Sequence, residues 1–156
     1  MFLNQGITFS VYSDRRGTEK IFLFDLIPRP VSSLEWVSIE QGLVQRIKAL
    51  NVFIHDVYHD RRIMKEGLVS RDLVLQSKAY TPEMEGFDPP GNQYLHVCGT
   101  DLVRDAHGRI MVLEDNGRTP SGVSYVLENG VVMKKIFPRL FERFRVRRVE
   151  DYPQRF

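Results

Sequence analysis

Two acidic side chains and one amide are spaced in a way that suits a divalent cation. Asp101 is followed by Glu114 and Asn116, and the apolar run Ile110–Leu113 leads directly into Glu114. All three side chains offer oxygen atoms, which are the ligands that Mg²⁺ prefers, whereas zinc favours nitrogen and sulfur. A magnesium site with so few protein ligands usually completes its coordination with water and substrate phosphate. The three residues therefore predict a magnesium site that works on phosphate groups.

Two more residues of the same stretch could bind an anion. Arg118 lies two residues beyond Asn116, where its guanidinium group could hold phosphoryl or carboxylate oxygens in a bidentate clamp. Ser121 is predicted to cap a helix that runs to about Lys135, and the free N–H groups at a helix start attract anions. These residues could also be ordinary polar groups of a hairpin and its following loop, and their spacing alone leaves both interpretations open.

The acidic residues lie on a predicted β-hairpin, and its register decides whether they meet. A two-residue loop at 106–107 makes Asp101 and Glu114 diagonal neighbours on the face that also carries Asn116. Gly99 then lies opposite Glu114 and, having no Cβ, leaves room above it for ions or a phosphate. A one-residue slip without a compensating bulge would put Asp101 and Glu114 on opposite faces.

The residue patterns place this hairpin in an α+β fold of two short antiparallel β-hairpins with packed helices. Ser32 and Glu35 form a capping box, and the apolar spacing behind it predicts one long helix or a kinked pair over about 33–58. The same kind of reasoning gives the other elements: strands at 6–13, 19–26, 94–104 and 109–115, and helices at about 60–66, 70–77, 121–135 and 140–144.

Length and composition limit the class of protein. The 156 residues, 42% hydrophobic and 27% charged, suit one globular domain, with a possible loop boundary near 80–92. The net charge of +2 gives no general attraction to nucleic acid or anionic lipid. The sequence has a single cysteine, no leader-like start and no apolar run of roughly 18 residues, which predicts a soluble cytoplasmic protein.

The spacing of the metal candidates is similar to a known motif. Asp101, followed thirteen residues later by Glu114-x-Asn116, resembles the metal-binding strands of the ATP-grasp superfamily, as in D-alanine–D-alanine ligase. Glu114-x-Asn116-x-Arg118 resembles the biotin carboxylase form of that motif. The wider sequence resembles the circularly permuted ATP-grasp family, which is related to glutathionylspermidine synthase. This likeness covers nearly the whole chain, and its matching segments are Gly6–Phe9, Phe24–Arg29, Leu50–Asn51, His55–Tyr58, Asp101–Asp105 and, most specifically, Leu113–Tyr125.

The resemblance implies a ligase that uses ATP and magnesium. In such enzymes ATP phosphorylates a substrate carboxylate, and an amine attacks the acyl phosphate to form an amide. Asp101, Glu114 and Asn116 would hold one or two Mg²⁺ ions that bridge the ATP phosphates, and Arg118 would be the catalytic residue. Asn116, Arg118 and Ser121 would contact the nucleotide. The expected partners are ATP and small carboxylate, amine or peptide substrates, and neither nucleic acid nor a membrane.

Two features depart from the family pattern. Gly117 stands next to the metal motif, where a bulkier residue is expected. The chain is also several times shorter than members of the family, and it has no glycine-rich phosphate loop. The circular permutation of the family places the lysines that bind the nucleotide beyond the Glu-x-Asn segment. We therefore expect residues 1–156 to be a single partial domain that carries the metal half of the active site and needs the missing C-terminal half of the ligase.

Two other functions remain open. The chain could be a non-catalytic module derived from such an enzyme, which binds a cation or a partner chain but not ATP. His55 and His59 have the i, i+4 spacing of the zinc pair in H-E-x-x-H proteases, which suggests a zinc hydrolase. However, Asp56 replaces the glutamate and no third ligand is evident. A packed pair of histidines at a helix end explains the spacing without a metal.

Two charged regions have more than one interpretation. Asp25 and Arg29 could lie at a substrate pocket or form an ion pair at a strand end. Residues 134–156 hold eight Lys/Arg against three acids, mixed with phenylalanines, which could suggest nucleic-acid binding. The phenylalanines keep helical spacing, so we favour an apolar stripe facing the core with a solvated basic side.

Overall fold

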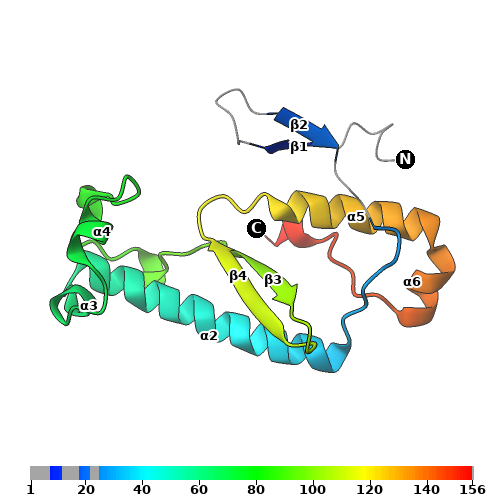
Figure 1. Cartoon of the computed structure of the whole chain (residues 1–156), viewed down its shortest axis with the longest axis horizontal. Coiled ribbons are helices and arrows are strands. Elements are labelled where there is room, and N and C mark those ends of the chain that lie inside the picture. Colours follow the sequence, from blue (N-terminus) through cyan, green and yellow to red (C-terminus); the bar gives the residue numbers. More distant parts are fainter. Residues whose placement is uncertain (1–7, 12–17, 22–24, 156) are drawn as a thin grey trace. The chain divides into compact units, whose positions relative to one another are not determined.

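The structure is a computed structural model that describes residues 8–11, 18–21 and 25–155, with side chains from residue 25 on. The chain divides into two compact units, Met1–Pro30 with Gly122–Phe156, and Val31–Ser121. Within the described ranges, helices accompany two antiparallel sheets of two strands each, which confirms the predicted α+β class (Figure 1). No helix in the described ranges combines the length and the apolar character that crossing a membrane requires.

The first unit combines a β-hairpin with the C-terminal helices. Strands β1 (Thr8–Val11) and β2 (Thr18–Ile21) pair antiparallel. The predicted turn between them, the outer ends of the first predicted strand and residues 22–24 of the second lie outside the described residues, whereas Asp25 and Leu26, predicted to end the second strand, are not in a strand. Helix α5 (Gly122–Ile136) buries Val132 and Met133, and the unit continues with α6 (Pro138–Phe144) and the 3₁₀ turn η3 (Tyr152–Gln154).

The second unit is organised around one long helix, α2 (Ser33–Tyr58). The helix begins where the sequence predicts, because the Ser32 hydroxyl oxygen accepts a hydrogen bond from the Glu35 N–H at 3.2 Å. It runs without a break for 26 residues, so the single helix is observed and not the kinked pair. Two short helices and two 3₁₀ turns follow it: α3 (Arg62–Lys65), α4 (Arg71–Leu75), η1 (Pro82–Met84) and η2 (Pro90–Asn92).

Strands β3 (Gly99–Arg104) and β4 (Ile110–Asn116) form the second hairpin, with a turn that differs from the expected one. The Asp105 N–H donates to the Arg109 carbonyl at 2.9 Å, and the Gly108 N–H donates to the Asp105 carbonyl at 3.0 Å. The loop therefore has three residues, 106–108, and not two. Gly108 has a φ of +82°, the left-handed conformation that closes such a loop. The predicted register is wrong by one residue for this reason.

A β-bulge then shifts the register a second time. Leu102 pairs with Val112 but Asp101 pairs with Glu114, so Leu113 is an extra residue in β4. Asn116 pairs with Gly99. Residues directly opposite each other in a hairpin share a face, so Asp101, Glu114 and Asn116 lie on one face after all. Asp101 and Glu114 are direct cross-strand partners and not the diagonal neighbours that the sequence predicted.

Polar contacts fix which face of the hairpin lies against α2. The Arg46 Nε lies 2.6 Å from the Asp115 Oδ2, and the Arg104 Nη1 lies 2.5 Å from the Glu35 Oε1. Thr100, on the same face as Asp115, donates its hydroxyl to the Asp115 Oδ1 at 2.9 Å. The two strands lie obliquely to the helix, with the turn end of the hairpin near the start of α2 (Figure 1). The face that carries Asp101 and Glu114 therefore points away from α2.

Apolar burial in the second unit is slight. Among its described residues only Val57, Met64 and Pro89 are buried. A further polar contact ties the chain before β3 to the helix, because the Asn51 Oδ1 accepts hydrogen bonds from the Tyr94 and Leu95 N–H groups at 2.8 and 3.1 Å. The geometry of this unit consequently depends on hydrogen bonds and ion pairs more than on a large core.

We predict that the Arg46–Asp115 pair is energetically coupled. In a double-mutant cycle of Arg46→Met and Asp115→Asn, we expect a coupling energy of about 1 kcal/mol from urea unfolding, because Asp115 is only 13% exposed. The control is the same cycle at Arg62 and Asp60, whose side chains are 75% and 61% exposed and should show almost none. Equal coupling in both cycles would contradict the role given to Asp115.

We also predict a pH dependence from the hairpin turn. The Asp105 Oδ1 accepts the N–H groups of His107 and Arg109 at 2.9 and 2.8 Å. The Arg109 N–H, followed by the Arg109 guanidinium, lowers the pKa of Asp105. A carboxyl with a lowered pKa in the folded state contributes stability above its unfolded pKa and loses it as the pH falls through the folded value.

Asp105→Asn isolates this contribution. The wild-type chain should be more stable than Asp105→Asn at neutral pH, and the difference in unfolding free energy should close as the pH falls below about 4. Urea unfolding at several pH values measures it. A difference that stays constant through the acid range would show that the charge of Asp105 plays no part.

Candidate functional site

The open face of the β3–β4 hairpin carries the predicted metal ligands. Asp101, Glu114 and Asn116 are all exposed on it. The Asn116 Nδ2 donates a hydrogen bond to the Glu114 Oε1 at 3.2 Å, which orients the amide beside the carboxylate. Direct cross-strand partners have Cβ atoms about 4.5–5.5 Å apart, so the carboxylates of Asp101 and Glu114 can reach a common ion. The structure brings these three residues together.

The donor set suits a hard cation. Two carboxylates and an amide provide only oxygen ligands on this face, and the exposure of all three side chains leaves room for water and phosphate oxygens. Magnesium needs about six oxygen ligands and commonly keeps several of them as water or substrate phosphate. Asp101, Glu114 and Asn116 therefore fit Mg²⁺ in number and in type.

Asp115 helps to position this site, a role that its sequence pattern does not predict. It points to the opposite face from Glu114, where Arg46 and Thr100 bind both of its carboxylate oxygens. The bulge at Leu113 makes this possible, because it changes which residues of β4 face α2. No pattern in the sequence marks the bulge, so the contact of Asp115 with Arg46 could not be predicted, although strand alternation did place Asp115 on the other face from Glu114.

The loop after β4 covers Gly99, which corrects one expectation. A Cβ built at Gly99 would lie 2.6 Å from the Cβ of Pro120, so the space above this glycine is filled by residue 120 and is not open to ions or phosphate. Gly117 is similarly tight, because a Cβ built there would lie 2.8 Å from a methyl group of Leu95. The two glycines let the 117–121 loop fold closely against the strand end.

The two anion-binding candidates lie on this loop. Arg118 is exposed and has no hydrogen bond or ion pair within the described part of the chain. Ser121 is exposed and is the last residue of its compact unit, and α5 begins at the next residue, Gly122. Arg118 follows Asn116 by two residues on this loop, and its phosphate contact, like the capping role and phosphate contact of Ser121, stays a prediction.

The histidine pair has a third neighbour that the sequence pattern did not predict. The Oδ1 of Asp88 lies 3.5 Å from the His55 Nε2 and 3.3 Å from the His59 Nε2. Asp56, which takes the place of the protease glutamate, instead accepts the N–H groups of Arg62 and Ile63 at 2.9 and 3.0 Å. It is therefore engaged in starting α3, and the zinc hydrolase hypothesis loses its general base.

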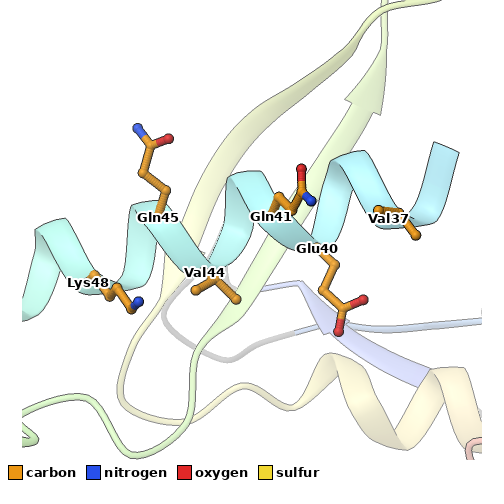
Figure 2. Close-up of a pocket in the computed structure, with 6 residues that line it drawn as sticks. All are labelled: Val37, Glu40, Gln41, Val44, Gln45 and Lys48. Atoms are coloured by element: carbon orange, nitrogen blue, oxygen red, sulfur yellow. The ribbon is translucent and has the colours of Figure 1, made fainter. Parts of the chain in front are cut away.

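An open hollow beside α2 is lined by side chains of that helix alone (Figure 2): Val37, Glu40, Gln41, Val44, Gln45 and Lys48. None of the predicted site residues lines it. A ligand pocket normally encloses most of its ligand between several elements. A surface formed by one helix does not, so the hollow is an exposed helix face and not a candidate active site.

Some of the remaining charged candidates have local partners. The Asp25 Oδ1 accepts the Ile27 N–H at 2.9 Å, and no ion pair joins Asp25 to Arg29 among the described residues. In the basic tail, Arg148 and Lys134 both pair with Glu150, and Arg155 pairs with Asp151. Phe144 is 63% exposed, so the stripe of phenylalanines is not fully covered.

We predict that Gly99→Ala displaces the loop that carries Arg118. The added methyl group would meet the rigid ring of Pro120, so the loop must move, and we expect a loss of about 1–3 kcal/mol in unfolding free energy. Backbone amide shifts of residues 117–121 should change. Gly42→Ala is the control, because nothing lies within 4 Å of its added methyl and α2 should gain about 0.5–1 kcal/mol. Unchanged loop shifts in Gly99→Ala would contradict the packing described.

Comparison with known proteins gives relatives along nearly the whole chain. An uncharacterized protein of Synechocystis is 49% identical over 150 residues, which cover 96% of this chain and 31% of the relative. An uncharacterized protein of Mycobacterium tuberculosis is 46% identical over 151 residues, or 97% of this chain and 27% of the relative. A protein of Frankia alni named "Putative glutamate–cysteine ligase 2-3" is 36% identical over 139 residues, or 88% of this chain and 16% of the relative.

The chain spans about a third or less of the length of these relatives. The matched region includes the hairpin, the 117–121 loop and α2. Residues 28–156 match the family described as circularly permuted ATP-grasp type 2. With most of its length covered by that match, and with the acidic hairpin face inside it, the chain belongs to the circularly permuted ATP-grasp type 2 family.

Proposed function

We propose that this chain supplies the magnesium-binding hairpin of an ATP-dependent ligase that joins a carboxylate to an amine through an acyl phosphate. The observation that carries the proposal is the shared open face of Asp101, Glu114 and Asn116, which offers only oxygen ligands. Family membership supports the use of ATP and magnesium. The name of the Frankia relative describes a ligase that joins a carboxylate to an amine, which is the same reaction class.

The residues have separate roles in this proposal. Asp101, Glu114 and Asn116 hold one or two Mg²⁺ ions, which neutralise charge on the ATP phosphates during transfer. Arg118 is the catalytic residue, because its guanidinium group, which has no partner among the described residues, can stabilise negative charge on the transferring phosphoryl group or on the acyl phosphate. Asn116, Arg118 and Ser121 contact the nucleotide. The closer likeness to glutathionylspermidine synthase and a cytoplasmic location belong to the same proposal.

The remainder of the ligase would come from the rest of the domain. The curated relatives are at least about three times as long as this chain, so the nucleotide-gripping lysines and the phosphate loop would be supplied by sequence that this chain does not contain. The whole enzyme's carboxylate and amine substrates, small molecules or peptides, are part of the proposal. Substrate choice would depend on that additional sequence.

One observation favours the second candidate, a non-catalytic binding module. The open face of the hairpin also exposes Val103, Met111 and Leu113, which are 44%, 50% and 68% exposed. Apolar side chains beside an acidic cluster could contact a partner chain as well as a nucleotide. A module of this kind would bind a cation or a partner but would show no affinity for ATP.

We predict that Glu114→Gln weakens cation binding at the hairpin. Mn²⁺ serves as the probe of the magnesium site, with electron paramagnetic resonance to measure free ion and Mg²⁺ as competitor. The substitution removes one charged ligand, so the Mn²⁺ affinity should fall by about tenfold or more. In a polypeptide that joins this segment to a complete ATP-grasp domain, Glu114→Ala should lower ATP-dependent amide formation by about 10²-fold or more.

Glu83→Gln is the matched control, since Glu83 is an exposed glutamate of the same unit that lies in η1. It should bind Mn²⁺ as the wild-type chain does. Retained activity in Glu114→Ala would overturn the site assignment. Mn²⁺ binding by the chain together with no effect of ATP, even with a complete domain present, would favour the binding module.

A further inference from the structure

His55, His59 and Asp88 form a cluster outside the hairpin site. One ligand atom of each lies within 4.8 Å of the other two. The two imidazole rings are stacked, with centroids 4.1 Å apart and planes inclined by 4°, so their Nε2 atoms point the same way. Both Nε2 atoms lie 3.3–3.5 Å from the same carboxylate oxygen of Asp88.

The hydrogen bonds of His59 fix which of its ring nitrogens carries a proton. The His59 Nδ1 lies 2.9 Å from the carbonyl oxygen of His55, which can only accept, so this nitrogen is the donor. In the neutral ring the Nε2 then holds a lone pair. This Nε2 is buried and has no hydrogen-bond partner, although the Asp88 oxygen lies 3.3 Å away. A lone pair facing a carboxylate is unfavourable unless a proton or a metal ion lies between them.

The distances match those of a tetrahedral metal site. Zinc binds imidazole nitrogen and carboxylate oxygen at about 2.0–2.2 Å, so two ligand atoms of a tetrahedron are separated by roughly 3.3–3.5 Å. The two separations from Asp88 to the histidines fall in this range. The bond from the His59 Nδ1 to a backbone carbonyl is also the usual support for a metal-bound histidine. The His55 ring, which is 45% exposed, can rotate to bring its Nε2 to the same distance from the His59 Nε2.

The segment that carries Asp88 is held in place on both sides. The Gly86 N–H donates to the Tyr58 carbonyl at 2.9 Å, and the Tyr94 N–H is bound by Asn51 at 2.8 Å. Between them, Pro89 is buried. The carboxylate is therefore brought to the end of α2 by the fold itself, so the approach of Asp88 to the two histidines is built into this unit.

We propose that His55, His59 and Asp88 bind one divalent transition-metal ion of the zinc class, which fastens the 86–95 segment to the C-terminal end of α2. Two imidazoles favour such an ion over magnesium. The partial exposure of His55 and Asp88 leaves the fourth ligand position open to water. The site is separate in residues and in ligand chemistry from the magnesium face, and it stands whether or not the proposed ligase function is correct.

The test is zinc binding by the full chain after metal removal. Competition with a chromophoric chelator in excess Mg²⁺ should give one Zn²⁺ per chain with micromolar or tighter affinity. Zn²⁺ should raise the melting temperature, and Co²⁺ should give the intense visible absorption of a tetrahedral site. Asp88→Asn keeps the shape of an exposed side chain but weakens the ligand, so the Zn²⁺ affinity should fall by about tenfold or more.

The controls separate loss of the site from loss of the fold. His107→Ala removes an exposed histidine from the β3–β4 turn and should bind Zn²⁺ as the wild-type chain does. Circular dichroism of Asp88→Asn should match wild type without metal. No Zn²⁺ binding by the wild-type chain, or equal binding by Asp88→Asn, overturns the proposal. Stabilisation on mild acidification with no response to Zn²⁺ also overturns it, and shows that a protonated histidine pairs with Asp88.

Discussion

The ion pair between Arg46 and Asp115 determines which face of the β3–β4 hairpin lies toward α2 and which faces solvent. Asp115 reaches Arg46 because the bulge at Leu113 turns its side chain toward α2, with the hydroxyl of Thr100 on its other oxygen. A carboxylate that is largely removed from water needs such partners, since burying it alone is costly. Once Asp115 is bound to the helix, the alternation of the strand sends Glu114 to the opposite face. The acidic face is thus a consequence of a contact made behind it.

Polar contacts of this kind replace a large core in the second unit. Val57, Met64 and Pro89 are its buried residues within the described range. Glu35, Arg46 and Asn51 each hold a distant segment to α2. Such contacts are directional, so they define the register and orientation of the hairpin as an apolar surface would not. Ion pairs are also weakened by salt and by acid, which makes the geometry of the site sensitive to solution conditions.

The sequence was sufficient for the order of the elements but not for all their bounds or for the register, since the strand predicted over 94–104 forms only at Gly99–Arg104. Helix α2 could be predicted closely because the Ser32 cap and the apolar spacing agree. The turn at Asp105 is compatible with two loop lengths, and the left-handed Gly108 selects the longer one. The bulge at Leu113 leaves no mark in the pattern. The longer loop and the bulge each shift the pairing by one residue, and the two shifts together return Asp101 and Glu114 to one face. The shared face was therefore predicted although the predicted register was wrong, because the site needs a shared face and not a particular pairing.

The two candidate cation sites depend on different levels of the structure. The acidic face is local, since its three ligands lie within one hairpin and the motif could be read from the sequence. The His55–His59 pair is local to α2, but Asp88 lies 29 residues beyond His59 and approaches it only through the contacts of Gly86 and Tyr94 with the helix. A change that loosens the 86–95 segment would therefore separate Asp88 from the two histidines before it affected the hairpin. The hairpin would keep its oxygen ligands together as long as Arg46 holds Asp115, so the two sites can be lost independently.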